Sequence, residues 1–434
     1  MCLRLMFIAC LILLPVPGIA SDDGYGYPIT DAYEATILGT PADLKPELPK
    51  DIRIRQLVLN VIPERRKPPI FFYDEGLNCT LAYQKQKAPL VFLIAGAGSS
   101  NLAPKLVTMM KALYQAGFHV ITLPSPTHPN FIISASQSSV PGDLAEDSAD
   151  LYRVMETAWN EVKGDIEVSD FFLAGYSLGG TQAAFVAKLD EERKLFNFRK
   201  VLMINPSVNL FNSVTKIEDL LKDIPGGPKK EGVFFNRMLA KFTAFYRYGN
   251  FITYNDEFLY AAFEERIFTH KETGGLIGLS YRINSAGMIF SSDVMTNGGY
   301  VVPKNRVLSS TDSLYDYFQV SIHLSFYNYV NEYFYPYFRK KRPGLTKEAL
   351  LASESLMGLE SYLKSSAKFG VMTNEDDFIL SPSELQYLKD VFGGRARIYP
   401  RGGHLGNLEY KENLAYMVGF FKDKLPEGGN IDAR

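Results

Sequence analysis

The chain of 434 residues is long enough for two or three average domains, or for one large α/β domain that carries an insertion. Its 46 Lys and Arg residues against 48 Asp and Glu residues give a net charge of -2, which offers no electrostatic support for nucleic acid or an acidic membrane surface as a partner. A hydrophobic content of 46% is that of an ordinary globular protein with a substantial core.

Residues 1–20 have the layout of a secretory signal peptide. A positive charge at Arg4 precedes an apolar stretch over residues 5–14, and small residues lead up to Ala20. The apolar stretch is short for a membrane span, and prolines at positions 15 and 17 interrupt the segment after it. We therefore expect cleavage near Ala20 and a secreted or periplasmic protein.

Residues 21–50 are predicted to form an N-terminal arm. The segment is rich in Gly, Pro, Asp and Tyr, and prolines stand at positions 28, 41, 46 and 49. This spacing argues against a continuous helix or strand.

Apolar runs typical of strands then alternate with helical patterns. Strands are predicted over residues 52–62, 80–83, 90–95, 118–123, 171–174, 200–205, 368–373 and 395–400. Helices are predicted to begin at residue 104 and to span residues 143–163, 181–189, 382–393 and 409–425. Two of them start with a predicted capping box, formed by Asp143 and Glu146 in one helix and by Ser381 and Glu384 in the other. Such alternation predicts a doubly wound, mostly parallel sheet, in which residues 51–206 form the first part of the core and 367–434 the second.

The alternation stops between the strand at 200–205 and the one at 368–373. Residues 207–366 hold 28 of the chain's 57 aromatic residues. We expect a mainly helical, aromatic-rich cap, in which most aromatics form the cap's own core and some line an acyl or aromatic ester pocket. Any contact with a membrane is expected to be made by this cap.

Residues 171–180 read FFLAGYSLGG, a buried strand followed by a tight turn and a helix. A turn of this kind holds its central residue in a strained backbone conformation and lifts the side chain clear of the sheet. Glycines two positions before and after it avoid clashes. Ser177 is therefore predicted to be presented as a nucleophile.

A serine hydroxyl needs a base, and the base needs an acid that orients it. Of the five histidines, only His404 follows the last predicted strand, in a loop with small flanking residues. The loop after the strand at 368–373 supplies three carboxylates, at Glu375, Asp376 and Asp377, of which one can face the histidine.

The motifs GYSLGG, TNEDDFI and GGHLG, with serine, acid and histidine in that order, resemble the α/β-hydrolase fold superfamily. The resemblance covers residues 52–207 and the chain from residue 368 onward. It implies that the acid is the fourth residue of its loop, which selects Asp377; a shift of one residue in register would select Asp376 instead.

The tetrahedral intermediate of acyl transfer needs backbone donors for its oxyanion. The resemblance assigns one donor to the residue after the nucleophile, Leu178. It places the other in the loop after the strand at 90–95, where the usual His-Gly is replaced by Ala95-Gly96, and Ala97 is our choice for the second amide.

The same loop, with Gly96 and Gly98, also begins a dinucleotide-binding fingerprint. The third glycine position holds Asn101, and the next strand ends in Pro124-Ser125-Pro126 without a carboxylate for a ribose. No HExxH or paired CxxC spacing occurs, so we expect neither a metal nor another cofactor.

These features predict a secreted serine hydrolase, a carboxylesterase or lipase-like enzyme acting on a small-molecule ester or lipid-like substrate. An acyltransferase or a peptidase would use the same triad. The alternative from another class is a hydrolase-like fold that serves as a binding or scaffold protein. The sequence does not set the oligomeric state.

Overall fold

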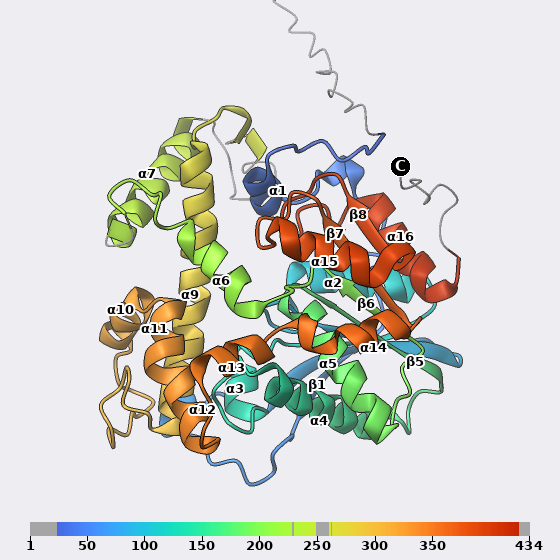
Figure 1. Cartoon of the computed structure of the whole chain (residues 1–434), viewed down its shortest axis with the longest axis horizontal. Coiled ribbons are helices and arrows are strands. Elements are labelled where there is room, and N and C mark those ends of the chain that lie inside the picture. Colours follow the sequence, from blue (N-terminus) through green and yellow to red (C-terminus); the bar gives the residue numbers. More distant parts are fainter. Residues whose placement is uncertain (1–23, 228–229, 249–259, 262, 425–434) are drawn as a thin grey trace, which may run out of the picture.

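A computed structural model describes residues 24–424, except 228–229, 249–259 and 262 (Figure 1). The predicted signal peptide, residues 1–20, lies outside the described residues. Eight strands form one sheet: β1 (Ile54–Leu59), β2 (Leu77–Ala82), β3 (Ala88–Ile94), β4 (His119–Leu123), β5 (Val168–Tyr176), β6 (Lys200–Ile204), β7 (Phe369–Asn374) and β8 (Ala396–Tyr399). Their order across the sheet is β1-β2-β4-β3-β5-β6-β7-β8.

The sheet is parallel from β4 to β8, while β2 runs antiparallel to both β1 and β4. The strands at its centre are covered on both faces, so they consist of almost continuous apolar residues, as in Leu90–Ile94, all of which are fully buried. The carboxyl ends of β5, β7 and β8 lie at one edge of the sheet because these strands are parallel, and that edge carries the site.

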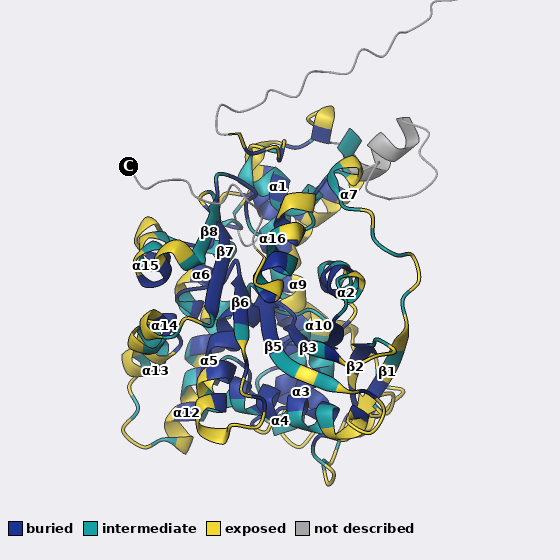
Figure 2. Cartoon of the chain, turned by 90° about the vertical axis from the view of Figure 1, so that its right-hand side faces the viewer, coloured by how far each residue is buried: buried dark blue, intermediate teal, exposed yellow. Residues whose placement is uncertain are grey.

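Helices cover both faces, and Figure 2 shows the central strands as buried between them. One core includes residues of α4 (Leu144–Val162), α5 (Leu178–Arg193) and α15 (Pro382–Phe392). The core on the other face includes residues of α2 (Pro104–Gln115) and α16 (Lys411–Lys422). The doubly wound, mostly parallel sheet predicted from the sequence is confirmed.

Between β6 and β7 the described residues form helices and no strand. They are α6 (Leu210–Asp219), α7 (Glu231–Tyr248), α9 (His270–Thr296), α10 (Tyr315–His323), α11 (Phe326–Asn328), η4 (Tyr329–Phe334), α12 (Tyr335–Lys341), α13 (Lys347–Ser353), η5 (Leu356–Leu359) and α14 (Glu360–Ser365). In Figure 1 the helices α7, α9 and α10 stand to one side of the sheet. We call the segment from α6 to α12 the cap.

Aromatic side chains of the cap contribute to a buried apolar core. Tyr329, Tyr333, Phe334 and Phe338 are buried there in mutual ring contacts. The same core includes Ile132 and Ile133 of α3 (Pro129–Ser134), a helix of the sheet domain, so the cap and the sheet domain share buried surface.

The prediction that the N-terminal arm holds no continuous helix is wrong. Helix α1 (Ala32–Leu38) lies between two of the prolines, followed by the short turn η1 (Ala42–Leu44). Asp31 caps α1 by accepting the backbone N–H groups of Tyr33 and Glu34, and Gly39 ends it at a φ of 72°. The seven residues between the N-cap residue Asp31 and Gly39 contain no proline, and they are sufficient for a short helix that packs on a folded domain.

The capping box predicted at the start of α4 is only half formed. Asp143 accepts the backbone N–H of Glu146, but the Glu146 side chain bonds Lys341 of α12 at 2.7 Å instead of turning back. Asp143 also pairs with Arg342 of the cap. The box at Ser381 and Glu384 is complete, as predicted. The last helix, α16, is shorter than the predicted 409–425.

Candidate active site

Ser177 occupies the sharp turn between β5 and α5. Its backbone lies at φ 54° and ψ −126°, a region that side-chain-bearing residues rarely adopt. A Cβ atom at Gly175 would lie 2.1 Å from the carbonyl oxygen of Gly179, and one at Gly179 would lie 2.4 Å from that of Ile94. Glycine is therefore required on both sides of the serine for steric reasons.

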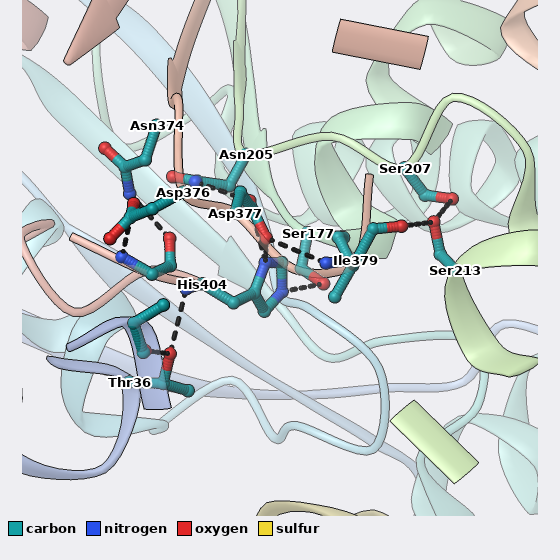
Figure 3. A network of polar contacts seen from close by, with 12 residues as sticks. Thr36, Ser177, Asn205, Ser207, Ser213, Asn374, Asp376, Asp377, Ile379 and His404 are labelled. Carbon is teal, nitrogen blue, oxygen red and sulfur yellow. Dashed lines mark hydrogen bonds and ion pairs between the residues drawn. The ribbon is translucent and has the colours of Figure 1, made fainter. Parts of the chain in front are cut away.

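His404 follows β8 and reaches the serine from the edge of the sheet (Figure 3). Its Nε2 atom lies 2.9 Å from Ser177 Oγ, within hydrogen-bond distance. The histidine is partly buried, and the ring of Phe378 stands edge-on to it at a centroid distance of 6.2 Å. The imidazole is thus placed where it can take the proton of the serine hydroxyl.

Asp377 is the carboxylate that faces His404. Both of its oxygens lie 3.1 Å from His404 Nδ1, and the side chain is buried. The structure thereby brings together Ser177, His404 and Asp377 from the ends of three different strands, β5, β8 and β7.

Asp376 does not contact the imidazole, although it adjoins Asp377 in sequence. Its carboxylate accepts the backbone N–H groups of Gly402 at 3.1 Å and Gly403 at 2.9 Å, and so holds the loop that carries His404. Burial raises the pKa of Asp376 above its usual value, while the two amide bonds lower it.

Asn205 is a residue of the site that the sequence interpretation missed. It follows β6 directly, adopts a φ of 43°, and donates from Nδ2 to Asp377 Oδ2 at 2.8 Å. This bond fixes the carboxylate that faces the histidine. Its position at the end of a parallel strand was the available signal, because the ends of β5, β7 and β8 meet at the same edge.

The backbone amides of Ala97 and Leu178 are free to bind an anion. Within the described part of the chain, neither N–H donates a hydrogen bond. Leu178 is the first residue of α5, where the helix dipole favours negative charge. Both residues border the same pocket beside Ser177.

Two cavities border this point and share Ala97, Tyr281 and Asn284 in their linings. The larger, which we call the vestibule, has a volume of about 610 Å³ and is lined by Ser177, His404 and residues of α1, α2 and α9. The smaller, the side pocket, measures about 40 Å³. Its lining is mostly apolar and comes from both the sheet domain and the cap: Ala97, Gly98, Thr127, Pro141, Gly142, Leu178, Leu210, Val214, Tyr281, Asn284, Ser285, Met288 and Phe326.

The other histidines that contact the sheet domain have structural roles. His119 is buried in β4 and contacts the carbonyl of Glu167, and burial lowers its pKa. His128 accepts the N–H of Asn130 at the start of α3. Among the described residues, no three His, Cys, Asp or Glu side chains are grouped to hold a metal ion. No described helix is both long and apolar enough for a membrane crossing.

Three features of the structure identify the fold. They are the strand order of the sheet, the strained serine between β5 and α5, and the order of serine, carboxylate and histidine along the chain. The chain has the α/β-hydrolase fold. The resemblance in the sequence motifs had implied this architecture, and it is confirmed.

No protein-family model matches the chain, and no curated protein matches it. Solved structures that align with it include an esterase of Pyrococcus furiosus, at 10% identity and a TM-score of 0.41, over 93% of this chain and 100% of the other. A proline iminopeptidase of Mycobacterium smegmatis aligns at 15% identity and a TM-score of 0.38, over 82% and 97%. A thioesterase domain from the curacin biosynthetic pathway aligns at 13% identity and a TM-score of 0.37, over 86% and 100%. Because these TM-scores are below 0.5, the fold assignment rests on the strands and turn of this chain.

Proposed function

We propose that the protein is a serine hydrolase that cleaves carboxylic esters through an acyl-enzyme. The observation that carries the proposal is the continuous chain of contacts from Asp377 through His404 to Ser177 Oγ, at 3.1 and 2.9 Å. A serine hydroxyl in a strained turn, with an imidazole on its oxygen and a buried carboxylate behind the imidazole, is the arrangement that nucleophilic acyl transfer requires.

The reaction begins when Ser177 Oγ attacks the ester carbon and its proton passes to His404 Nε2. Asp377 holds the Nδ1–H tautomer and stabilises the imidazolium that forms. The amides of Leu178 and Ala97 receive the negative oxygen of the tetrahedral intermediate, each contributing about 3 kcal/mol of barrier lowering. His404 then gives its proton to the leaving alcohol, and an acyl-Ser177 ester remains.

Hydrolysis of the acyl-enzyme repeats these steps with water. His404 takes a proton from the water, the hydroxide adds to the acyl carbon, and the carboxylic acid leaves as Ser177 recovers its proton. The vestibule lies over both Ser177 and His404, so it is the route by which the alcohol departs and water arrives.

The side pocket is the place for the acyl group. It begins at the two amides and continues between Leu210 and Val214 of α6 and Met288 of α9. An acyl oxygen bound by the amides of Ala97 and Leu178 directs its chain into this apolar space. We further propose that residues 1–20 direct the enzyme out of the cytoplasm, as their signal-peptide layout suggests.

The test is labelling of the purified protein with a fluorophosphonate probe, which reacts with activated serines. We expect the wild type to be labelled and Ser177→Ala and His404→Ala to lose labelling. Ser365→Ala and His323→Ala, which alter exposed residues of the same types away from the site, serve as matched controls and keep it.

Absence of labelling in a folded wild type would contradict the proposal and favour the binding-protein alternative. Product analysis with aryl esters, with and without added alcohols or amines as competing acceptors, then distinguishes hydrolysis from acyl transfer. Hydrolysis predicts the free acid as the main product at moderate acceptor concentrations.

A further inference from the structure

Helix α1 of the N-terminal arm lies against the loop that carries His404, although the two are more than 350 residues apart in sequence. Thr36 and Ile37 line the vestibule together with Ser177 and His404. Figure 3 shows Thr36 directly beside the backbone of His404.

The contact is a hydrogen bond to the catalytic loop itself. The backbone N–H of His404 donates to Thr36 Oγ1 at 2.9 Å. The same hydroxyl donates its own proton to the carbonyl of Ala32 at 2.7 Å, within α1. Because the Thr36 hydroxyl donates its only proton to Ala32, its oxygen can act only as the acceptor toward the N–H of His404.

The loop also packs on the backbone of α1 without intervening side chains. A Cβ atom at Gly403 would lie 2.0 Å from the carbonyl oxygen of Ala32, and one at Gly406 would lie 2.1 Å from that of Ala35. Beyond the helix, Thr40 Oγ1 donates to the carbonyl of Gly406 at 3.0 Å. These contacts, made by Gly403 before His404 and by Gly406 after it, fix the position of the loop against α1.

Three consecutive amides of the loop have assigned partners. Asp376 accepts those of Gly402 and Gly403, and Thr36 accepts that of His404. The sheet domain thus holds the residues before the histidine, whereas the histidine's own amide is held by the arm.

The arm is fixed firmly enough to act as a support. Arg401 Nε donates to the carbonyl of Tyr27 at 2.7 Å, and Tyr27 is fully buried. On its other side α1 meets the cap, where His270 Nδ1 lies 2.7 Å from Asp31 and the His270 ring stacks on Tyr33.

We propose that Thr36 is a positioning residue for His404, so that the N-terminal arm is part of the catalytic apparatus. The inference rests on the proposed function. Loss of the Thr36 oxygen leaves the His404 amide facing a methyl group and releases the imidazole from its alignment with Ser177 Oγ. Small misplacements of a catalytic group reduce turnover without weakening substrate binding.

The experiment compares Thr36→Val, which keeps the shape and removes the oxygen, with Thr36→Ser, which keeps the oxygen. With p-nitrophenyl acetate, we expect Thr36→Val to lower kcat by about 10- to 100-fold with KM changed less than about twofold. Thr36→Ser is expected to recover most of the loss.

The matched control is Thr157→Val. Thr157 Oγ1 makes the same bond to the carbonyl four residues back, on α4, at 2.8 Å, with no contact to the site, so kcat should remain within about twofold of wild type. A Thr36→Val enzyme as active as wild type, or a Thr36→Ser enzyme as impaired as Thr36→Val, would overturn the inference.

Amide hydrogen exchange of the folded wild-type protein, measured over residues 402–406, provides a second test that needs no variant. The inference requires slow exchange at the His404 amide, and exchange at the rate of an unstructured chain would overturn it. A wild type that reacts with neither ester nor fluorophosphonate refutes the proposed function, and this inference with it. A reactive wild type with unaffected Thr36→Val refutes the inference alone.

Discussion

Two adjacent carboxylates perform different tasks at this site. The Asp377 side chain is directed at the imidazole of His404, and that of Asp376 is directed at the amides two and one residues before it. Consecutive residues in an irregular loop can point to opposite sides, so one loop can both orient the base and hold its backbone. Asp377 acts on the reacting groups, and Asp376 acts through the loop.

We expect Asp377→Asn to lower kcat by about 10⁴-fold, because an amide stabilises the wrong imidazole tautomer and cannot stabilise the imidazolium. Asp376→Asn keeps one oxygen for the loop amides and should reduce kcat by about tenfold or less. Steady-state hydrolysis of p-nitrophenyl acetate measures both.

Glu375→Gln is the control for this pair, since its exposed side chain pairs with Lys389 on the surface and should leave kcat unchanged. If Asp376→Asn proves more damaging than Asp377→Asn, the triad acid has been assigned to the wrong residue.

The residues that sequence analysis located are those set by local pattern. Ser177 is marked by its turn, and His404 and the acidic loop of residues 375–377 by following strands of a parallel sheet. The choice of Asp377 within that loop came from the family resemblance. Asn205 also follows a parallel strand, but nothing in the sequence indicates that it faces Asp377. Thr36 carries no such mark. The roles of Asn205 and Thr36 depend on which loop lies opposite, and for Thr36 the partner lies at the far end of the chain. Such pairings arise from tertiary packing, which spacing along the sequence does not encode.

At the scale of elements, the site is shaped by two cap helices laid over the strand ends. Helix α6 contributes Leu210 and Val214 to the side pocket, and α9 contributes Tyr281 and Met288. Among the described aromatic residues of the cap, Tyr329, Tyr333, Phe334 and Phe338 are buried in the core shared with α3, and Phe326 is the described phenylalanine that lines the side pocket. The proposed acyl pocket is thus lined mainly by aliphatic side chains.

Filling the side pocket should shift preference toward short acyl chains. We expect Val214→Phe to lower kcat/KM for p-nitrophenyl butyrate at least about tenfold more than for the acetate, because the added ring occupies the space of the two additional methylenes. Rates with esters of two to eight carbons give the profile.

Ile217→Phe, one turn further along α6 and facing the vestibule, is the comparison variant. It should affect the acetate and the butyrate to a similar degree. An equal loss for both esters in Val214→Phe would show that the acyl chain lies elsewhere.

The predicted elements of the sheet domain correspond closely to those observed because strands buried on both faces have a clear apolar signal. Helix α1 was missed because prolines flank it and because its seven residues are short for a helix that is stable alone. It exists through its packing on Tyr27, the histidine loop and the cap.

At the scale of the whole molecule, acidic groups are buried where the cap joins the sheet domain. Glu354, after α13, accepts the N–H of Leu144 at the start of α4 at 2.6 Å. Burial, with the nearby charge of Asp143, raises the pKa of Glu354 to about 8. Arg342 of the cap pairs with Asp143 at the same junction.

This shifted pKa sets a dependence of stability on pH. Between the ordinary value of 4.5 and about 8, the unfolded chain has lost the Glu354 proton and the folded chain retains it. The stability that this group contributes is therefore fully present below pH 4.5 and is lost progressively as the pH rises toward about 8.

We expect Glu354→Gln, which does not titrate, to melt at a higher temperature than wild type at pH 8 and close to it at pH 5. Differential scanning calorimetry at the two pH values measures the change. Glu348→Gln, on the exposed side of α13, should melt with wild type at both. A Glu354→Gln shift of the same size at pH 5 and pH 8 would contradict the assignment.

The contact between α1 and the loop of residues 402–406 has a consequence for biosynthesis. A nascent chain that has been translated only as far as β8 contains Ser177 but lacks His404, so it has no base, and its arm has no loop to contact. Under the proposed function, activity requires that the C-terminal loop and the N-terminal arm come together in the folded chain. If residues 1–20 direct export, as we propose, the chain would be inactive while it crosses the membrane unfolded and would become active in the compartment where it folds.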